Sequence, residues 1–221
     1  MLCIWKIELL TYLVVSDKKI ILVGYSGHGL VVADTALENN LNVIGYTEKS
    51  INEANPYMFK YLGNELNPDF KGWDLNVSFV LGIGDNLLRE KIYNHILKKG
   101  KKVISLINSS SSISSFAMIG EGIFVNRNVT INAFAKIGSN VILNTGCIVE
   151  HECEIHDNVH IAPGAVLAGN VKVGSGSFIG ANSVIKQGVE IGKNVIVGSG
   201  TVVLNDISDG NKIVGNPHRF I

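Results

Sequence analysis

Apolar residues recur at every sixth position through the second half of this chain. The series uses only Ile, Leu and Val, and it runs with no gap and no insertion: Ile107, Ile113, Ile119, Val125, Ile131, Ile137, Leu143, Val149, Ile155, Ile161, Leu167, Val173, Ile179, Ile185, Ile191, Val197 and Val203. A second series of small or β-branched residues lies four positions after each member from Ile119 onward. A period of six fits neither a helix nor a simple alternating strand. It is typical of a triangular solenoid in which each side is one short strand followed by a turn.

The sequence therefore predicts a left-handed parallel β-helix, a prism with three hexapeptides in each coil. The large apolar series fills the interior, and the second series lies where the wall turns, with Gly and Asn beside it because they tolerate positive φ. Fifteen repeats from Ile119 give about five coils. Cys147 and Cys153 belong to the second series, so both are predicted to be core residues.

Residues 18–106 show a different pattern, in which short apolar runs alternate with amphipathic stretches. Strands are predicted at 19–24, 42–47, 77–82 and 102–107, and helices at 30–39 and 86–99. Alternating strands and helices predict right-handed βαβ units and a small Rossmann-like parallel sheet. The predicted organisation is an N-terminal extension at 1–17, an α/β domain at 18–106 and a β-helix domain at 107–221.

The net charge and the cysteine content limit the classes of function and the cellular compartments to be expected. Equal numbers of acidic and basic residues give a formal net charge of zero, which argues against binding nucleic acid or an anionic membrane through the overall field. The odd cysteine count, completed by Cys3, suggests no disulfide framework, so a cytoplasmic location is expected. Residues 1–17 are apolar but interrupted by Lys6 and Glu8, so they predict neither a membrane span nor a signal peptide. A peripheral membrane contact of this segment is the alternative.

Three histidines lie within ten residues of the predicted prism: His151, His156 and His160. His151 comes two positions after the inward Val149, so its side chain is expected to point outward beside two acidic neighbours, Glu150 and Glu152. A carboxylate bonded to one ring nitrogen fixes the tautomer and makes the other nitrogen a better base. The cluster favours a general base for an amine or hydroxyl nucleophile, and the alternative is a solvated surface histidine.

The spacing of His151 and His160 suggests a shared site. Nine residues are half a coil, so the two side chains lie on different parts of one prism. In a threefold trimer, one wall of each prism faces a wall of its neighbour. We therefore expect His151 of one subunit to approach His160 of the next.

A metal site is the rival interpretation of these histidines. The five-residue separation of His151 and His156 resembles that in γ-class carbonic anhydrases, which share the prism and bind zinc through three histidines. In those enzymes the third zinc ligand lies about two coils earlier, and the corresponding place in this chain is near Ser115. Residues 101–150 contain no histidine, so no metal is predicted.

A glycine-rich turn follows the first predicted strand at residues 24–29. Its amides and the start of the next helix can hold phosphate. Because it lacks the G-x-G-x-x-G spacing, it does not predict a dinucleotide site, and a plain tight turn is the alternative.

Three segments together resemble one known family. They are Ile20-Ile-Leu-Val-Gly-Tyr-Ser-Gly-His-Gly29, Gly82-Ile-Gly-Asp-Asn-Leu-Leu-Arg89 and Asn144-Thr-Gly-Cys-Ile-Val-Glu-His-Glu-Cys153. The combination is similar to the bacterial sugar O-/N-acyltransferases, which include the sialic acid O-acetyltransferase-like proteins and the N-acetyltransferases of UDP- or GDP-linked 4-amino sugars. The resemblance covers residues 18–221.

The resemblance implies two groups of binding residues and a catalytic pair. On the nucleotide-sugar side, the residues that match positions by the phosphates or the sugar are Gly24, Ser26, Gly27 and His28. Glu48 matches a residue that contacts the base or the ribose, and Asn144 matches a polar residue near the reacting amine. On the acetyl-CoA side, His160 and Gly169 match contacts to the thioester arm, Ala181 and Ser199 lie along the pantetheine, and Pro217 lies near the adenine. His151 matches the catalytic base and Glu152 its orienting acid.

The predicted reaction moves acetyl from acetyl-CoA to the 4-amino group of a nucleotide-linked 4-amino-4,6-dideoxy sugar, as a step of glycan biosynthesis. The partners implied are the nucleotide-activated amino sugar, acetyl-CoA and two further copies of the chain in a homotrimer. One alternative is O-acetylation of a sialic-acid-like sugar. An alternative from another class is a noncatalytic or metal-dependent β-helix protein.

Overall fold

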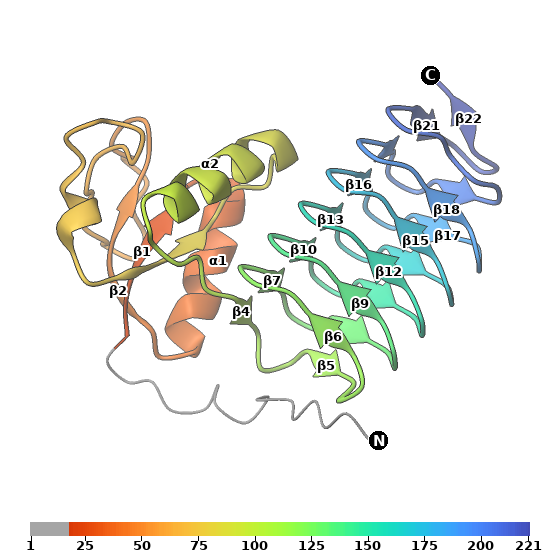
Figure 1. The fold of residues 1–221 in the computed structure, drawn as a ribbon, viewed down its shortest axis with the longest axis horizontal. Coiled ribbons are helices and arrows are strands. Elements are labelled where there is room, and N and C mark those ends of the chain that lie inside the picture. Colours follow the sequence, from red (N-terminus) through yellow and green to blue (C-terminus); the bar gives the residue numbers. More distant parts are fainter. Residues whose placement is uncertain (1–17) are drawn as a thin grey trace.

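The computed structural model describes residues 18–221, and the predictions made for residues 1–17, including Cys3, lie outside the described residues. A small α/β domain lies against the first coils of a long prism, and the coils continue to the C-terminus (Figure 1). Both parts of the predicted fold class are confirmed: a small parallel sheet with helices, followed by a left-handed parallel β-helix.

The α/β domain contains one parallel sheet with the strand order β2-β1-β3. Its elements are β1 (Lys19–Val23), α1 (Gly27–Glu38), β2 (Asn42–Thr47), the short 3-10 helix η1 (Lys71–Asp74), β3 (Ser78–Leu81) and α2 (Asn86–Lys98). Helix α1 begins three residues before its predicted start, inside the glycine-rich turn, because Ser26 takes the extended conformation of an N-cap. Within residues 18–221, no helix is both long and apolar enough to cross a membrane.

The predicted fourth strand of this sheet, at 102–107, is wrong. Val103 forms only an isolated bridge to Phe79, after which the chain leaves the sheet. The amide of Leu106 instead donates to the carbonyl of Ile123, so Leu106–Ile107 is β4, the first strand of the prism. A run of apolar residues cannot tell these two fates apart, because both strands are buried.

The prism has three faces, each a parallel sheet of two-residue strands except at the C-terminal end, where the last strand pairs antiparallel with the three-residue strand before it. The strands are β4 (Leu106–Ile107), β5 (Ser112–Ile113), β6 (Met118–Ile119), β7 (Phe124–Val125), β8 (Thr130–Ile131), β9 (Lys136–Ile137), β10 (Ile142–Leu143), β11 (Ile148–Val149), β12 (Glu154–Ile155), β13 (His160–Ile161), β14 (Val166–Leu167), β15 (Lys172–Val173), β16 (Phe178–Ile179), β17 (Val184–Ile185), β18 (Glu190–Ile191), β19 (Ile196–Val197) and β20 (Val202–Val203). Two strands close the end, β21 (Lys212–Val214) and β22 (Arg219–Phe220).

We name each face by its first strand. The β4 face is β22-β21-β19-β16-β13-β10-β7-β4, the β5 face is β20-β17-β14-β11-β8-β5, and the β6 face is β18-β15-β12-β9-β6. Each strand pairs with the strand one coil later, as Ile142 does with His160. The corner where the chain passes from the β4 face to the β5 face is the β4–β5 corner, and the next is the β5–β6 corner.

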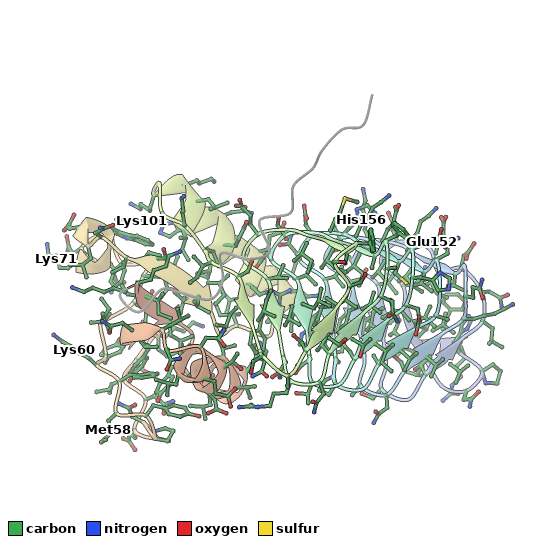
Figure 2. The ribbon with its side chains drawn as sticks, turned by 90° about the horizontal axis from the view of Figure 1, so that it is seen from below. Met58, Lys60, Lys71, Lys101, Glu152 and His156 are labelled. Carbon is green, nitrogen blue, oxygen red and sulfur yellow. The ribbon has the colours of Figure 1, made fainter. Side chains whose placement is uncertain are left out.

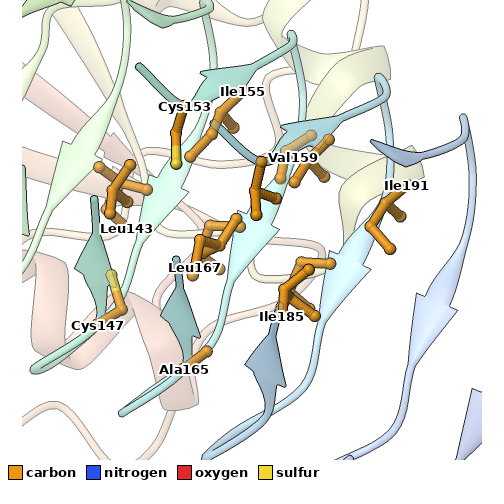
Figure 3. Packing of buried hydrophobic residues seen from close by; sticks show 14 of the residues in the cluster. Leu143, Cys147, Cys153, Ile155, Val159, Ala165, Leu167, Ile185 and Ile191 are labelled. Atoms are coloured by element: carbon orange, nitrogen blue, oxygen red, sulfur yellow. The ribbon is translucent and has the colours of Figure 1, made fainter. Parts of the chain in front are cut away.

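The large apolar series fills the inside of the prism, as predicted, and the second series, at the turns of the wall, is buried with it. Their members form one apolar cluster, in which Cys147 and Cys153 are fully buried (Figure 3). Burial raises the pKa of the Cys147 thiol to about 12, so this sulfur stays protonated and unreactive. The prediction that both cysteines are core residues is confirmed.

The α/β domain covers the first coils of the β4 face. The outward side chains Leu106, Phe124 and Ile142 belong to the same buried cluster as Val32 and Ala33 of α1. Helix α2 packs on the opposite side of the sheet, in a separate cluster. The domain is thus fixed on one face of the prism, and the β5 and β6 faces carry no such cover within residues 18–221.

Candidate active site

The carboxyl ends of the three sheet strands form the edge where the glycine-rich turn lies. Gly24 follows β1, Glu48 follows β2 and Gly82 follows β3. Glu48 accepts a hydrogen bond from the amide of Tyr25, at 3.1 Å. The structure thus brings Glu48 beside the turn that holds Gly24, Ser26, Gly27 and His28. Ligands of open parallel sheets bind at this edge.

Close backbone packing explains the glycines of this edge. A Cβ on Gly29 would lie 2.2 Å from the carbonyl oxygen of Gly24, and one on Gly82 would lie 2.3 Å from the same oxygen. Gly24 also has a φ of 84°, which side chains disfavour. The turn is therefore as tight as its sequence predicts, and the Ser26 side chain makes no capping bond to α1.

His28, Asn144 and His160 meet where the α/β domain touches the β4 face. His160 lies on β13 and is only 7% exposed, with its ring centroid 6.0 Å from that of His28. Nδ1 of His160 faces the Gly84 carbonyl at 3.2 Å and Nε2 faces the Asn144 amide at 3.2 Å. A neutral ring with its proton on Nδ1 satisfies both contacts. His160 therefore holds Asn144 at the β4–β5 corner.

Both buried histidines are kept neutral by their surroundings. Burial, together with the nearby Arg89 cation, lowers the pKa of His28 to about 4 and that of His160 to about 3. The Gly84 carbonyl opposes this shift at His160. Both rings are therefore uncharged near neutral pH.

These depressed pKa values predict a loss of stability in mild acid. Histidine in the unfolded chain titrates near pH 6.5, so between about pH 6.5 and 4 the unfolded state binds protons that the folded state does not. The free energy of unfolding should fall by roughly 1 kcal/mol per histidine from pH 7.5 to 5.5. Urea unfolding at both pH values checks this, and His28→Gln should lose about half as much. Equal stability of the wild type at the two pH values would contradict it.

His151 and Glu152 lie together at the β5–β6 corner, between β11 and β12. Nδ1 of His151 is 3.1 Å from Oε2 of Glu152, and the two side chains are 52% and 64% exposed. Figure 2 shows Glu152 on the outside of the prism. The expected outward direction of His151 is therefore confirmed, and Nδ1 is the ring nitrogen that faces Glu152.

Gly169 lies one coil after His151 and leaves room for its ring. A Cβ added to Gly169 would lie 2.4 Å from Cε1 and 2.5 Å from Nε2 of His151. The backbone of Gly169 is not in the left-handed region. The glycine is therefore needed for the position of the imidazole rather than for the backbone.

Because His151 is the predicted base, Gly169→Ala is expected to displace its ring and lower turnover about tenfold or more, since displacing a catalytic group costs rate steeply. Steady-state kinetics check this, with thermal unfolding as a control for stability. In a His151→Ala background the same change should have no further effect on turnover, because the displaced ring is already gone. An equal loss in both backgrounds would show that Gly169 acts independently of His151.

The remaining predicted acetyl-CoA positions line up on the β4–β5 corner. Ala181, Ser199 and Pro217 follow β16, β19 and β21, one coil apart. The amide of Gly200 donates to the carbonyl of Ala181, which ties neighbouring coils in this register. Asn144 lies on the same corner, two coils earlier.

Within one chain, the predicted site residues lie in two separate groups. His160 lies on the β4 face, and the β5–β6 corner with His151 is the corner opposite that face. His151 and His160 of one chain therefore cannot act on the same atom, as their half-coil spacing predicts. The site divides into one set with His151, Glu152 and Gly169, and another with His28, Asn144, His160 and the β4–β5 corner.

Known proteins share this architecture. The chain matches the PglD N-terminal domain family over residues 19–96 and the bacterial transferase hexapeptide family over 134–169 and 170–205. The acetyltransferase domain of PglB from Neisseria gonorrhoeae FA1090, solved with acetyl coenzyme A, is 30% identical, with a TM-score of 0.86 over 93% of this chain and 100% of that one. PerB from Caulobacter crescentus, solved with CoA and GDP-perosamine, is 30% identical, with a TM-score of 0.84 over 92% and 97%.

This chain belongs to the hexapeptide-repeat family of nucleotide-amino-sugar N-acetyltransferases. WeeI from Acinetobacter baumannii AYE, 25% identical, has the same fold with a TM-score of 0.84 over 93% of this chain and 100% of that one. The resemblance in the sequence therefore identified the right family. Within residues 18–221, no three His, Cys, Asp or Glu side chains are grouped to hold a metal ion.

Arg89, which was not predicted as a functional residue, joins the two domains. Its side chain is 1% exposed and donates to the carbonyls of Gly84 (3.2 Å), Asn140 (3.1 Å) and Asn158 (2.8 Å). Arg89 is the last residue of the second segment that carries the family resemblance. An arginine on a helix face that also carries the apolar Ile92 and Ile96 was the available signal.

Asn126 was also missed. It is 1% exposed, and its amide donates to Oδ1 of Asn144 at 3.0 Å and to Oγ1 of Thr145 at 2.7 Å. Asn126 precedes Asn144 by one coil, so the repeat itself was the signal. The pair fixes the side chain of Asn144, which is predicted to lie near the reacting amine.

Proposed function

We propose that this protein transfers acetyl from acetyl-CoA to the 4-amino group of a nucleotide-linked 4-amino-4,6-dideoxy sugar. The observation that carries the proposal is the His151–Glu152 pair on an exposed corner, where Nδ1 of His151 lies 3.1 Å from Oε2 of Glu152. Gly169, which has no side chain, leaves room for the His151 ring. Two family members support the substrates: PerB was solved with CoA and GDP-perosamine, and the PglB domain with acetyl coenzyme A.

His151 is the general base of the proposed reaction. Glu152 accepts a hydrogen bond from Nδ1–H, which leaves the lone pair of Nε2 for the substrate. The sugar amine attacks the thioester carbonyl and gives its proton to Nε2, either directly or once attack has begun, and the C–S bond then breaks to release CoA. Backbone amides of the coils stabilise the oxyanion. The buried Cys147 and Cys153 take no part, so no acyl-enzyme forms.

A homotrimer brings the two sets of site residues together. The β5 face carries an outward apolar row of Ile148, Val166, Val184 and Val202, whereas the β6 face carries the ion pairs Lys136–Glu154 and Lys172–Glu190. The β4 face is partly covered by the α/β domain. The apolar β5 face is therefore the one that packs around the threefold axis.

That packing joins unlike corners. When three β5 faces surround one axis, the β5–β6 corner of each subunit meets the β4–β5 corner of the next. His151 and Glu152 then lie beside Asn144, His160 and the Ala181–Ser199–Pro217 line of the neighbour. A solution mass of three chains by light scattering tests the assembly, and a monomeric active enzyme would contradict it.

The reaction is tested by incubating the purified protein with acetyl-CoA and a panel of nucleotide-linked sugars, while free thiol release and the acetylated product are measured. We expect turnover with 4-amino-4,6-dideoxy sugars and product with an amide bond. Turnover only with hydroxyl acceptors would establish the O-acetyltransferase alternative instead. No thiol release with any acceptor would overturn the proposal.

A further inference from the structure

From Gly122 onward, one backbone position in each hexapeptide of the prism is left-handed. It lies immediately before each residue of the second apolar series, from Gly122 to Gly200. Twelve of these fourteen positions hold Gly or Asn, the residues that tolerate positive φ. The two exceptions are Phe134, with φ 63°, and Glu152, with φ 60°. A phenylalanine in this conformation is strained, and such strain clusters at functional sites.

The two exceptions lie on the same corner in consecutive coils. The amide of Glu152 donates to the carbonyl of Ala133, next to Phe134, at 3.1 Å. The strands on either side are in register, with Ile148 opposite Thr130 and Glu154 opposite Lys136. Phe134 therefore lies one coil before the carboxylate that orients His151.

Phe134 is part of an exposed apolar surface. Its side chain is 59% exposed, and its ring centroid is 5.6 Å from that of Phe116, which occupies the same corner one coil earlier and is 65% exposed. Met118, beside them at the start of the β6 face, is 57% exposed. Aromatic side chains this open to water suggest an apolar ligand surface.

We propose that Phe134, supported by Phe116, binds the apolar edge of the acceptor sugar, with its 6-deoxy methyl group, while the amine faces His151. The inference rests on the proposed function. Gly169, the predicted thioester contact, lies on the C-terminal side of His151, so the acceptor approaches from the N-terminal side where Phe134 lies. Packing a methyl group and ring C–H groups against an aromatic face removes apolar area from water. A polar residue at this position would lose that contact.

Phe134→Asn is the sharpest test, because Asn holds this left-handed position at six other turns of the prism, including Asn170 on the same corner. We expect unchanged or higher thermal stability, an unchanged KM for acetyl-CoA and a KM for the amino sugar raised about tenfold. The preference for a 6-deoxy acceptor over its 6-hydroxy counterpart, measured as a ratio of kcat/KM, should fall several-fold. Phe134→Tyr keeps the ring face and should behave like the wild type.

Three outcomes would overturn the inference. An unchanged acceptor KM and an unchanged 6-deoxy preference in an active Phe134→Asn enzyme would remove the sugar contact and leave the proposed function intact. A lower solution mass of that variant would show that Phe134 is a subunit contact instead. A wild-type protein that transfers no acetyl to any nucleotide amino sugar would remove the proposed function and this inference together.

Discussion

His151→Ala is expected to lower kcat for acetyl transfer by at least about 10²-fold, the lower part of the range for a general base. The ring is half exposed and lies outside the apolar core, so its removal should change the free energy of unfolding by less than about 0.5 kcal/mol. The KM values should change little, because the proton is transferred only as the amine attacks. Single-turnover release of CoA thiol measures the chemical step directly.

His156→Ala is the matched control for this variant. His156 is also exposed, lies five residues later on the same prism, and has no carboxylate of residues 18–221 within salt-bridge distance. It also occupies the metal-ligand spacing with His151 that the rival interpretation needs. We expect normal turnover from this control, with and without a chelator. Near-normal turnover of His151→Ala would defeat the general-base assignment.

Much of the fold was readable from the sequence because a six-residue repeat leaves little freedom. Both apolar series point inward in every coil, and any one-residue slip would turn the buried side chains outward. The strand at 102–107 could not be read in the same way. Its residues are apolar whether they pair with β3 or begin the prism, and only the tertiary hydrogen bonds of Ile104 and Leu106 decide.

The site was predictable where a local pattern carries the chemistry. The His151–Glu152 contact follows from adjacent residues at one corner, and the glycine-rich turn follows from its own composition. Contacts between distant segments were not predictable, since nothing near His160 in the sequence indicates Gly84 or His28 as neighbours. The strain at Phe134 became visible only when backbone angles showed that its equivalents are left-handed.

Arg89→Met is expected to lower the free energy of unfolding by about 3 kcal/mol or more. The buried guanidinium donates to carbonyl oxygens from both domains, and methionine would leave these acceptors without a donor, at about 1–3 kcal/mol for each one that stays buried. Burial lowers the pKa of Arg89 to about 10, so the charge itself is costly to bury. The Met variant no longer has to bury this charge, which is a gain in stability. The loss from several buried carbonyl oxygens without a donor is larger than that gain, because only one group is spared desolvation. Urea unfolding at pH 7.5 measures the difference.

Arg127→Met is the control at the same domain junction. Arg127 pairs with Asp34 at 2.7 Å and with Glu38, but all three side chains are at least one-third exposed, so this variant should lose less than about 1 kcal/mol. Arg89→Met should also raise the pKa of His160 toward its ordinary value, because the nearby cation that lowers it is gone. Proton NMR titration of the histidine rings follows this shift. Equal stability losses in the two arginine variants would show that Arg89 is no more than another surface contact between the domains.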